Sequence, residues 1–264
     1  MKIAFCISGE TREHNKFYGP DSMITYLMEL GHTVDVFGHT WDHSEVPNSS
    51  LYNFKLLQID NQHKIISDWK NVDLINRAWF ADSTQIVKES GKEMIQSLDI
   101  TNAKIGQHVS GWKCLQMPDT DQYDVFYRWR WDLELAPGSL ENERYMIDKT
   151  LIPWLDYVKT NNKIPIVITD NSGWIARNIS VQDQHFFMNK LTHLNIKQKP
   201  WEEAISNVWY TNREKCSYHM LWNWMLIDEA GAFIGEKVHD IVSLTATLPR
   251  NNDEKFELTD LGET

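Results

Sequence analysis

The first ~40 residues place a helical segment between two apolar runs, and this order constrains the fold more than any other feature. Residues Lys2–Ser8 form a short apolar run that ends in Ser-Gly, which is typical of a buried strand. Apolar residues at helical spacing predict a helix over Asp21–Leu30, which Gly31 stops. A second apolar run follows over Thr33–His39. This order predicts a βαβ unit with two parallel strands.

Later segments extend the unit into a larger sheet with helices packed on it. The opening strand is expected at the centre of this sheet. Further strands are predicted over residues 51–60, Tyr123–Leu135 and Lys163–Thr169, and helices over Ile105–Met117, Asp183–Leu191 and Lys215–Glu229. The predicted fold class is therefore α/β, with one domain over residues 1–249 and a helical C-terminal part. Residues 250–264 are expected to form a polar, acidic tail.

Composition removes several classes of protein from consideration. Hydrophobic residues make up 42% of the chain and charged residues 24%, which excludes collagen, a coiled coil or disorder as a description of the whole chain. The net charge of −11 does not attract nucleic acid, although a local basic groove stays open. Three cysteines without CxxC spacing predict free thiols. With neither a signal peptide nor a membrane span evident, we expect a cytoplasmic protein.

Two polar segments follow the first two strands, where open α/β sheets bind ligands. After the first strand, Gly9 allows a ligand to approach the backbone, and Arg12, four residues beyond Ser8, can pair with a phosphate. After the second strand, His39 and Asp42 can hold a sugar hydroxyl or a base edge. The alternatives are a plain β–α turn and a polar cap at the end of a strand.

The strand predicted over Tyr123–Leu135 has charges in its middle. Strand alternation puts four charged residues on one face and Trp129, Trp131 and Leu133 on the other. The charged residues are Arg128, Arg130, Asp132 and Glu134. Such charges are costly to bury unless they pair or bind a ligand. The arginines can hold phosphate, and the DxE pair can hold a divalent cation that bridges a diphosphate. The alternative is an exposed edge strand whose charges neutralise one another.

Three later residues complete the list of candidates. Asp183 is either an ordinary N-cap of the helix predicted there or a base that deprotonates an acceptor hydroxyl. Glu214 is the second choice for this base. His239 is a candidate third metal ligand beside Asp132 and Glu134, and a structural histidine is its alternative. Nucleotide and hydrolase motifs such as GxGxxG, GxxxxGK[ST], HExxH and GxSxG are absent.

Four motifs in register resemble a group of bacterial and viral glycosyltransferase-like proteins. They are Ser-Gly-x-x-Arg (Ser8–Arg12), Asp-Val-Phe-x-His-Thr-Trp-Asp (Asp35–Asp42), Tyr-Asp-x-x-x-Arg-x-Arg-x-Asp-Leu (Tyr123–Leu133) and an Asp-centred block (Val181–Phe187). Their order and rough spacing agree across about residues 2–190. The chain departs from the group in two places. Glu10-Thr11 replaces the usual Gln-Pro, and DxE replaces the metal-binding DxD.

The resemblance implies a GT-A-like, Rossmann-like sheet, mixed or parallel and flanked by helices, that uses a nucleotide sugar. Ser8, Gly9 and Arg12 would line the nucleotide pocket, and His39 and Asp42 would border it. These five residues all follow, or end, the first two predicted strands.

The resemblance also implies contacts beyond the nucleotide pocket. Arg130 and Asp132 would meet the diphosphate, and Asp183 would face the acceptor or donor sugar. Mn²⁺ or Mg²⁺ is the implied cofactor. Metal-independent use of Arg128 and Arg130 remains the alternative, because the DxE element departs from the usual pattern.

The function that follows is transfer of a sugar from a nucleoside diphosphate, with UDP expected, to a hydroxyl acceptor. The acceptor is either a surface glycan or 5-hydroxymethylcytosine in phage DNA. The chain has the character of a tailed-phage protein, for which the host cytoplasm is the expected location. The alternative function is a sugar- or nucleotide-binding protein without catalysis, and a third reading is an interaction protein whose aromatics form an oligomer interface.

Overall fold

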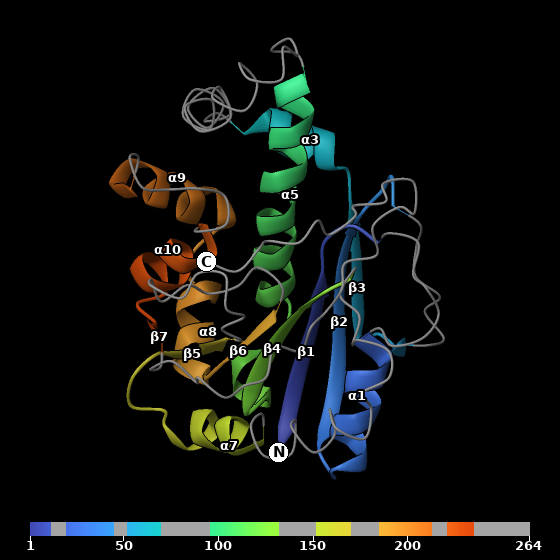
Figure 1. Ribbon diagram of the computed structural model, residues 1–264, viewed down its shortest axis with the longest axis vertical. Helices are drawn as coiled ribbons and strands as arrows, with labels where there is room; N and C mark the ends of the chain where they lie inside the picture. Colours follow the sequence, from blue (N-terminus) through green and yellow to red (C-terminus); the bar gives the residue numbers. More distant parts are fainter. Residues whose placement is uncertain are drawn as a thin grey trace, which may run out of the picture.

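The structure is a computed structural model that describes residues 1–11, 20–44, 52–69, 96–131, 152–169, 185–212 and 221–234. A sheet forms its centre, and helices cover the sheet (Figure 1). The expected α/β class, a mixed sheet flanked by helices, is therefore confirmed. The predicted tail over residues 250–264 lies outside the described residues.

Seven strands form one sheet in the order β3-β2-β1-β4-β6-β5-β7. Their bounds are β1 (Lys2–Ser8), β2 (Thr33–Trp41), β3 (Leu56–Asp60), β4 (Val125–Arg130), β5 (Ile166–Thr169), β6 (His185–Met188) and β7 (Phe233–Ile234). Strand β6 runs antiparallel to both of its neighbours, and every other pairing in the sheet is parallel. The carboxyl ends of six strands therefore point to the same edge of the sheet.

The strand β1 is an interior strand of this sheet, as predicted. It pairs with β2 on one side and with β4 on the other. Ala4 and Cys6 face one hydrophobic cluster, whereas Ile3, Phe5 and Ile7 face the other. A strand between two apolar layers needs apolar side chains on both faces, which explains the uninterrupted apolar run.

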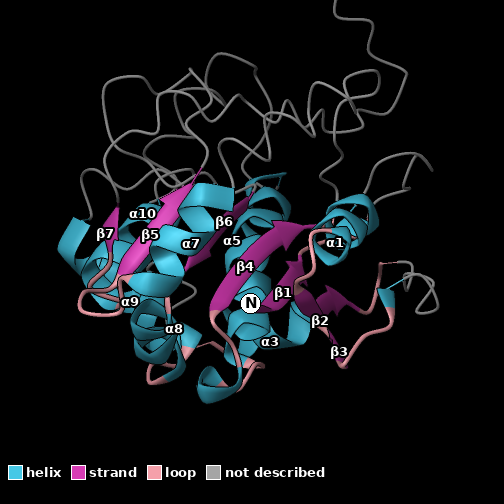
Figure 2. Cartoon of the chain, turned by 90° about the horizontal axis from the view of Figure 1, so that it is seen from below, coloured by secondary structure: helices cyan, strands magenta, loops and turns pink. Residues whose placement is uncertain are grey.

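Helices cover both faces of the sheet (Figure 2). On the face of Ile3 and Phe5 lie α1 (Pro20–Glu29) and α7 (Ile152–Thr160). On the opposite face lie α3 (Gln62–Asp68), α5 (Gln96–Gln116), α8 (Lys190–Lys197), α9 (Trp201–Asn212) and α10 (Leu221–Trp224). A π-helical turn, Met225–Glu229, follows α10, and a 3₁₀ turn, Thr120–Gln122, precedes β4. Within the described residues, no helix has both the length and the apolar character that a membrane crossing requires.

The predicted βαβ unit is confirmed in detail. The helix α1 begins at Pro20, a residue favoured in a first turn because it lacks an N–H. It ends at Glu29, and the predicted stop residue, Gly31, follows with a φ of +81°. The N–H groups of Gly31 and His32 donate to the carbonyls of Met28 and Leu27, at 2.9 and 3.1 Å. This pair of bonds is a Schellman motif, which glycine adopts without steric strain.

The prediction of a helix over Asp183–Leu191 is wrong. Residues His185–Met188 form strand β6, and helix α8 begins only at Lys190, after an N-cap by Asn189. The four residues of β6 are all buried. Periodicity does not separate a strand from a helix in so short an apolar run, and its two phenylalanines favour a strand.

Two other predicted helices have different bounds in the structure. Helix α5 is longer than the predicted Ile105–Met117, because it begins at Gln96. Of the predicted helix Lys215–Glu229, the described part is α10 and the π-helical turn. Helices α7 and α9 were missed by the sequence patterns. Cys6 and Cys114 are free thiols, as expected, and are buried.

Candidate functional site

The strand order reverses at the centre of the sheet, between β1 and β4. From β1 the chain continues to β2 and β3 on one side, whereas β4 pairs with the other side of β1. At the carboxyl edge, Ser8 pairs with His39 of β2 and with Arg130 of β4. Open α/β sheets bind ligands in the crevice beyond such a reversal. The pairing thus brings three of the predicted site residues to the place where this topology favours a ligand.

The turn after β1 has a backbone shape that requires glycine. Gly9 has a φ of +111°, and no described atom lies within 4 Å of the position that a Cβ would occupy. Its N–H donates to Oγ of Ser110 on α5, at 2.8 Å. Helix α5 therefore fixes the start of the turn, while no residue of the described ranges fills the other side of Gly9. Arg12 lies outside the described residues.

His39 lies fully buried beneath this edge, and both of its ring nitrogens are bonded. Nδ1 lies 2.8 Å from Oγ of Ser110, and Nε2 lies 3.0 Å from Oδ2 of Asp60 at the end of β3. An ionised carboxylate only accepts, so Nε2 carries the proton and Nδ1 accepts from the Ser110 hydroxyl. The backbone carbonyl oxygen of His39 accepts from the indole N–H of Trp131 at 2.9 Å. His39 therefore joins α5, the end of β3 and the residue that follows β4.

The groups around Asp60 favour its ionised form. The hydrogen bond from His39 holds the pKa of Asp60 well below its usual range, and bonds from Lys113 and Gln58 act in the same direction, against burial. Lys113 Nζ lies 2.5 Å from Oδ2 of Asp60. Burial lowers the pKa of His39, although Asp60 opposes this shift. A neutral His39 beside an ionised Asp60 is consistent with the hydrogen bonds described above.

The two arginines of β4 occupy different surroundings. Arg128 is fully buried, with its guanidinium 5.2 Å from the ring of Trp222 and 5.8 Å from the ring of Phe186. Arg130, at the end of the strand, is 9% exposed. Arg130 therefore puts positive charge at the carboxyl edge, whereas Arg128 lies among aromatic rings on one face of the sheet.

The predicted alternation of β4 is confirmed over the described residues. Trp129 and Trp131 belong to the cluster on the face opposite Arg128. The alternative of an exposed edge strand is wrong, because β4 lies between β1 and β6 and all of its residues are buried. Asp132 and Glu134 lie outside the described residues.

Asp42, His43 and Glu10 form the solvent side of the same edge. The Asp42 side chain is 46% exposed and accepts from Nδ2 of Asn61 at 2.6 Å. His43 Nε2 lies 3.5 Å from a carboxylate oxygen of Glu10, so the segments after β1 and β2 approach each other. Asp42 thus lies at the same edge of the sheet, next to the residue that approaches the turn after β1, and its place beside a nucleotide stays a prediction.

The remaining predicted residues lie outside the described part of the chain. They are Asp183, Glu214 and His239. Among residues that the structure describes, no group of three or more histidine, cysteine, aspartate or glutamate side chains converges as a metal site. The proposed metal ligands Asp132, Glu134 and His239 are not in that described set.

Three residues of this region were missed by the sequence patterns. Ser110, Asp60 and Lys113 connect α5 and β3 to the carboxyl edge. Asp60 had a partial signal, because it ends a predicted strand. Ser110 and Lys113 had none, since their contacts depend on how α5 crosses the sheet.

No protein-family model, curated protein or solved structure matches this chain.

Proposed function

We propose that the protein is a glycosyltransferase that moves a sugar from a nucleoside diphosphate, UDP being our choice, to a hydroxyl acceptor. The observation that carries this proposal is the pairing of Ser8 with Arg130 where the strand order reverses. A ligand at this point would meet the open side of Gly9 and the positive charge of Arg130. Arg12 and Asp132 follow these strand ends within a few residues.

Departure of a nucleoside diphosphate requires that its negative charge be stabilised. Arg130 is our first candidate for this role, because it ends β4 at the proposed site. Asp132 and Glu134 offer oxygen ligands of the type that Mg²⁺ and Mn²⁺ prefer, and such an ion would supply further positive charge. The proposed fold is the GT-A-like form of the mixed sheet described above.

The acceptor hydroxyl requires a base. Asp183, which lies just before β6 in the sequence, is our first choice for it, and Glu214 is the second. A surface glycan and hydroxymethylated DNA both remain proposed acceptors. The net charge of −11 favours the glycan, because DNA binding draws on a positive field. A cytoplasmic location, in the host for a phage protein, is part of the same proposal.

The test measures nucleotide binding and sugar transfer in the Arg130→Gln variant. If Arg130 contacts the diphosphate, loss of a charge-assisted hydrogen bond weakens UDP binding about 10- to 100-fold. Lys163→Gln is the matched control, because this exposed cation precedes β5 at the opposite edge of the sheet. Circular dichroism and a melting curve without ligand check that both variants fold.

Three results would count against parts of this proposal. Equal UDP affinity in Arg130→Gln, Lys163→Gln and wild type would remove Arg130 from the site. UDP binding without hydrolysis or transfer of any nucleotide sugar would leave a binding protein rather than an enzyme. Absence of binding to every nucleoside diphosphate would contradict the proposal as a whole.

A further inference from the structure

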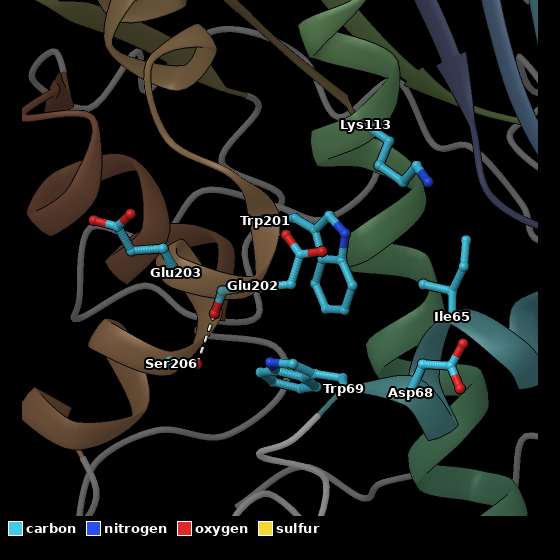
Figure 3. Close-up of a pocket in the computed structure, with 8 residues that line it drawn as sticks. All are labelled: Ile65, Asp68, Trp69, Lys113, Trp201, Glu202, Glu203 and Ser206. Carbon is cyan, nitrogen blue, oxygen red and sulfur yellow. Dashed lines mark hydrogen bonds between the residues drawn. The ribbon is translucent and has the colours of Figure 1, made fainter.

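A cavity of about 560 Å³ lies on the face of the sheet that α3, α5 and α9 cover, and none of Ser8, Gly9 and Arg130 lines it. Three segments that are distant in sequence line it: the end of α3, the last turn of α5 and the first turns of α9 (Figure 3). Its lining consists of Ile65, Asp68, Trp69, Lys113, Trp201, Glu202, Glu203 and Ser206. The volume falls within the range of about 300–1,000 Å³ that is usual for small-molecule sites.

Two indole rings form the apolar wall of this cavity. Trp69 and Trp201 pack edge to face, with ring centroids 5.2 Å apart and planes at 64°. Because they cover each other, only 7% and 6% of these residues is exposed. A nucleobase or a sugar that binds by stacking needs an open ring face, and this pair offers little. The half-buried Ile65 and the small exposed parts of the two rings form a narrow apolar surface, which suits the side of an aliphatic chain instead.

Carboxylates dominate the polar part of the cavity. Asp68, Glu202 and Glu203 are exposed and line it; Figure 3 shows Glu202 beside Trp201, whereas the Glu203 side chain points away from the two rings. The single cation of the lining, Lys113, is already bound to Asp60, which does not line the cavity. Within the described ranges, none of the three lining carboxylates takes part in an ion pair. An anion is therefore repelled from the cavity, and a cation is attracted.

The position of Asp68 strengthens this conclusion. Glu202 and Glu203 lie in the first turn of α9, where the helix dipole stabilises negative charge without any ligand. Asp68 is different, because it is the last residue of α3 and lies at the end of the helix that disfavours negative charge. A cation in the cavity would offset this unfavourable position.

We propose that this cavity binds a small organic cation, a protonated amine carried on an aliphatic stem. The stem packs against Ile65 and the two indoles, and the ammonium group lies between Asp68 and Glu202. The proposal is independent of the function proposed above, because Asp68 and Glu202, which would hold the cation, take no part in the site proposed at the carboxyl edge.

Calorimetric titration of the full chain with cadaverine tests the proposal, with pentanediol of the same length as the uncharged comparison. We expect saturable binding of cadaverine and none of the diol. Asp68→Asn and Glu202→Gln should each weaken cadaverine binding about three- to fivefold, as the loss of one exposed ionic contact predicts. Asp156→Asn is the control, because it removes an exposed carboxylate on α7, on the other face of the sheet.

Several outcomes would overturn the proposal. Equal weakening by Asp156→Asn would show that cadaverine responds to the overall charge of the chain rather than to this cavity. Equal affinity for the diol would show that charge plays no part. Unchanged affinity in both cavity variants, or no binding of cadaverine, would remove the site. UDP titration of the same variants keeps the two proposals separate, since both cavity variants should bind UDP like wild type.

Discussion

Replacement of Ser110 by alanine tests the account of the network beneath the carboxyl edge. The Ser110 hydroxyl accepts from the N–H of Gly9 and donates to Nδ1 of His39, both at 2.8 Å. Alanine at this position leaves two buried polar groups without a partner. Each such group costs about 1–3 kcal/mol, whereas the better helix propensity of alanine returns about 0.5 kcal/mol. We therefore expect the free energy of unfolding to fall by about 1.5–5.5 kcal/mol.

The ring of His39 cannot recover the lost bond by exchanging its proton. If Nδ1 became the protonated nitrogen, the bare Nε2 would face the ionised Asp60 carboxylate at 3.0 Å. The two residues should therefore depend on each other. A double-mutant cycle of Ser110→Ala with His39→Gln is expected to give a coupling energy of about 1 kcal/mol or more.

Urea denaturation at pH 7.5, followed by tryptophan fluorescence, measures this loss. Ser206→Ala is the control, because Ser206 also lies in a helix, and its hydroxyl donates to the carbonyl of Glu202 one turn earlier. The control should change the free energy of unfolding by no more than about 0.5 kcal/mol. A loss below about 0.5 kcal/mol in Ser110→Ala would refute the network as described.

Two further predictions concern the core. Gly111→Ala puts a Cβ 2.5 Å from the ring of buried Trp222. This substitution should lower the free energy of unfolding by about 1–3 kcal/mol, measured by a denaturation curve, and unchanged stability would contradict this packing. Burial lowers the pKa of His193 to about 3, below the value near 6.5 in the unfolded chain. The neutral His193 side chain therefore contributes fully to stability above pH ~6.5, and this contribution is lost as pH falls toward 3. Melting at several pH values should therefore show a weaker dependence in His193→Gln than in wild type, by up to about 1.4 kcal/mol per pH unit, and parallel curves would show that His193 does not take part.

The first part of the fold could be predicted because its signals are local. The apolar run of β1, the helical spacing of α1 and the positive φ of Gly31 lie within single segments of sequence. Strand β6 could not be predicted in the same way. Its four residues become a strand because they pair with β4 and β5, and pairing with distant segments is invisible to periodicity.

The candidate site likewise has residues with local signals in the sequence and residues without them. Ser8, Gly9 and Arg130 could be predicted because each lies at, or directly after, the end of an apolar strand. The support beneath them could not. Ser110 meets Gly9 across 101 positions in sequence, through the way α5 lies on the sheet, and no local pattern encodes that contact. The interior position of His39 is also a tertiary effect, because α5 and the end of β3 supply both of its partners.

The most direct test of the central claim is the melting temperature of the full chain with saturating UDP and other nucleoside diphosphates, in Mn²⁺ and in EDTA. A ligand that binds only the folded state at about 100 times its Kd stabilises it by about 2.7 kcal/mol, which corresponds to roughly 5–10 °C in a chain of this size. The account predicts a saturable rise of this order with one nucleotide, and its reduction in Arg130→Gln. No rise with any nucleoside diphosphate, under either condition, would contradict a nucleotide site at the reversal between β1 and β4.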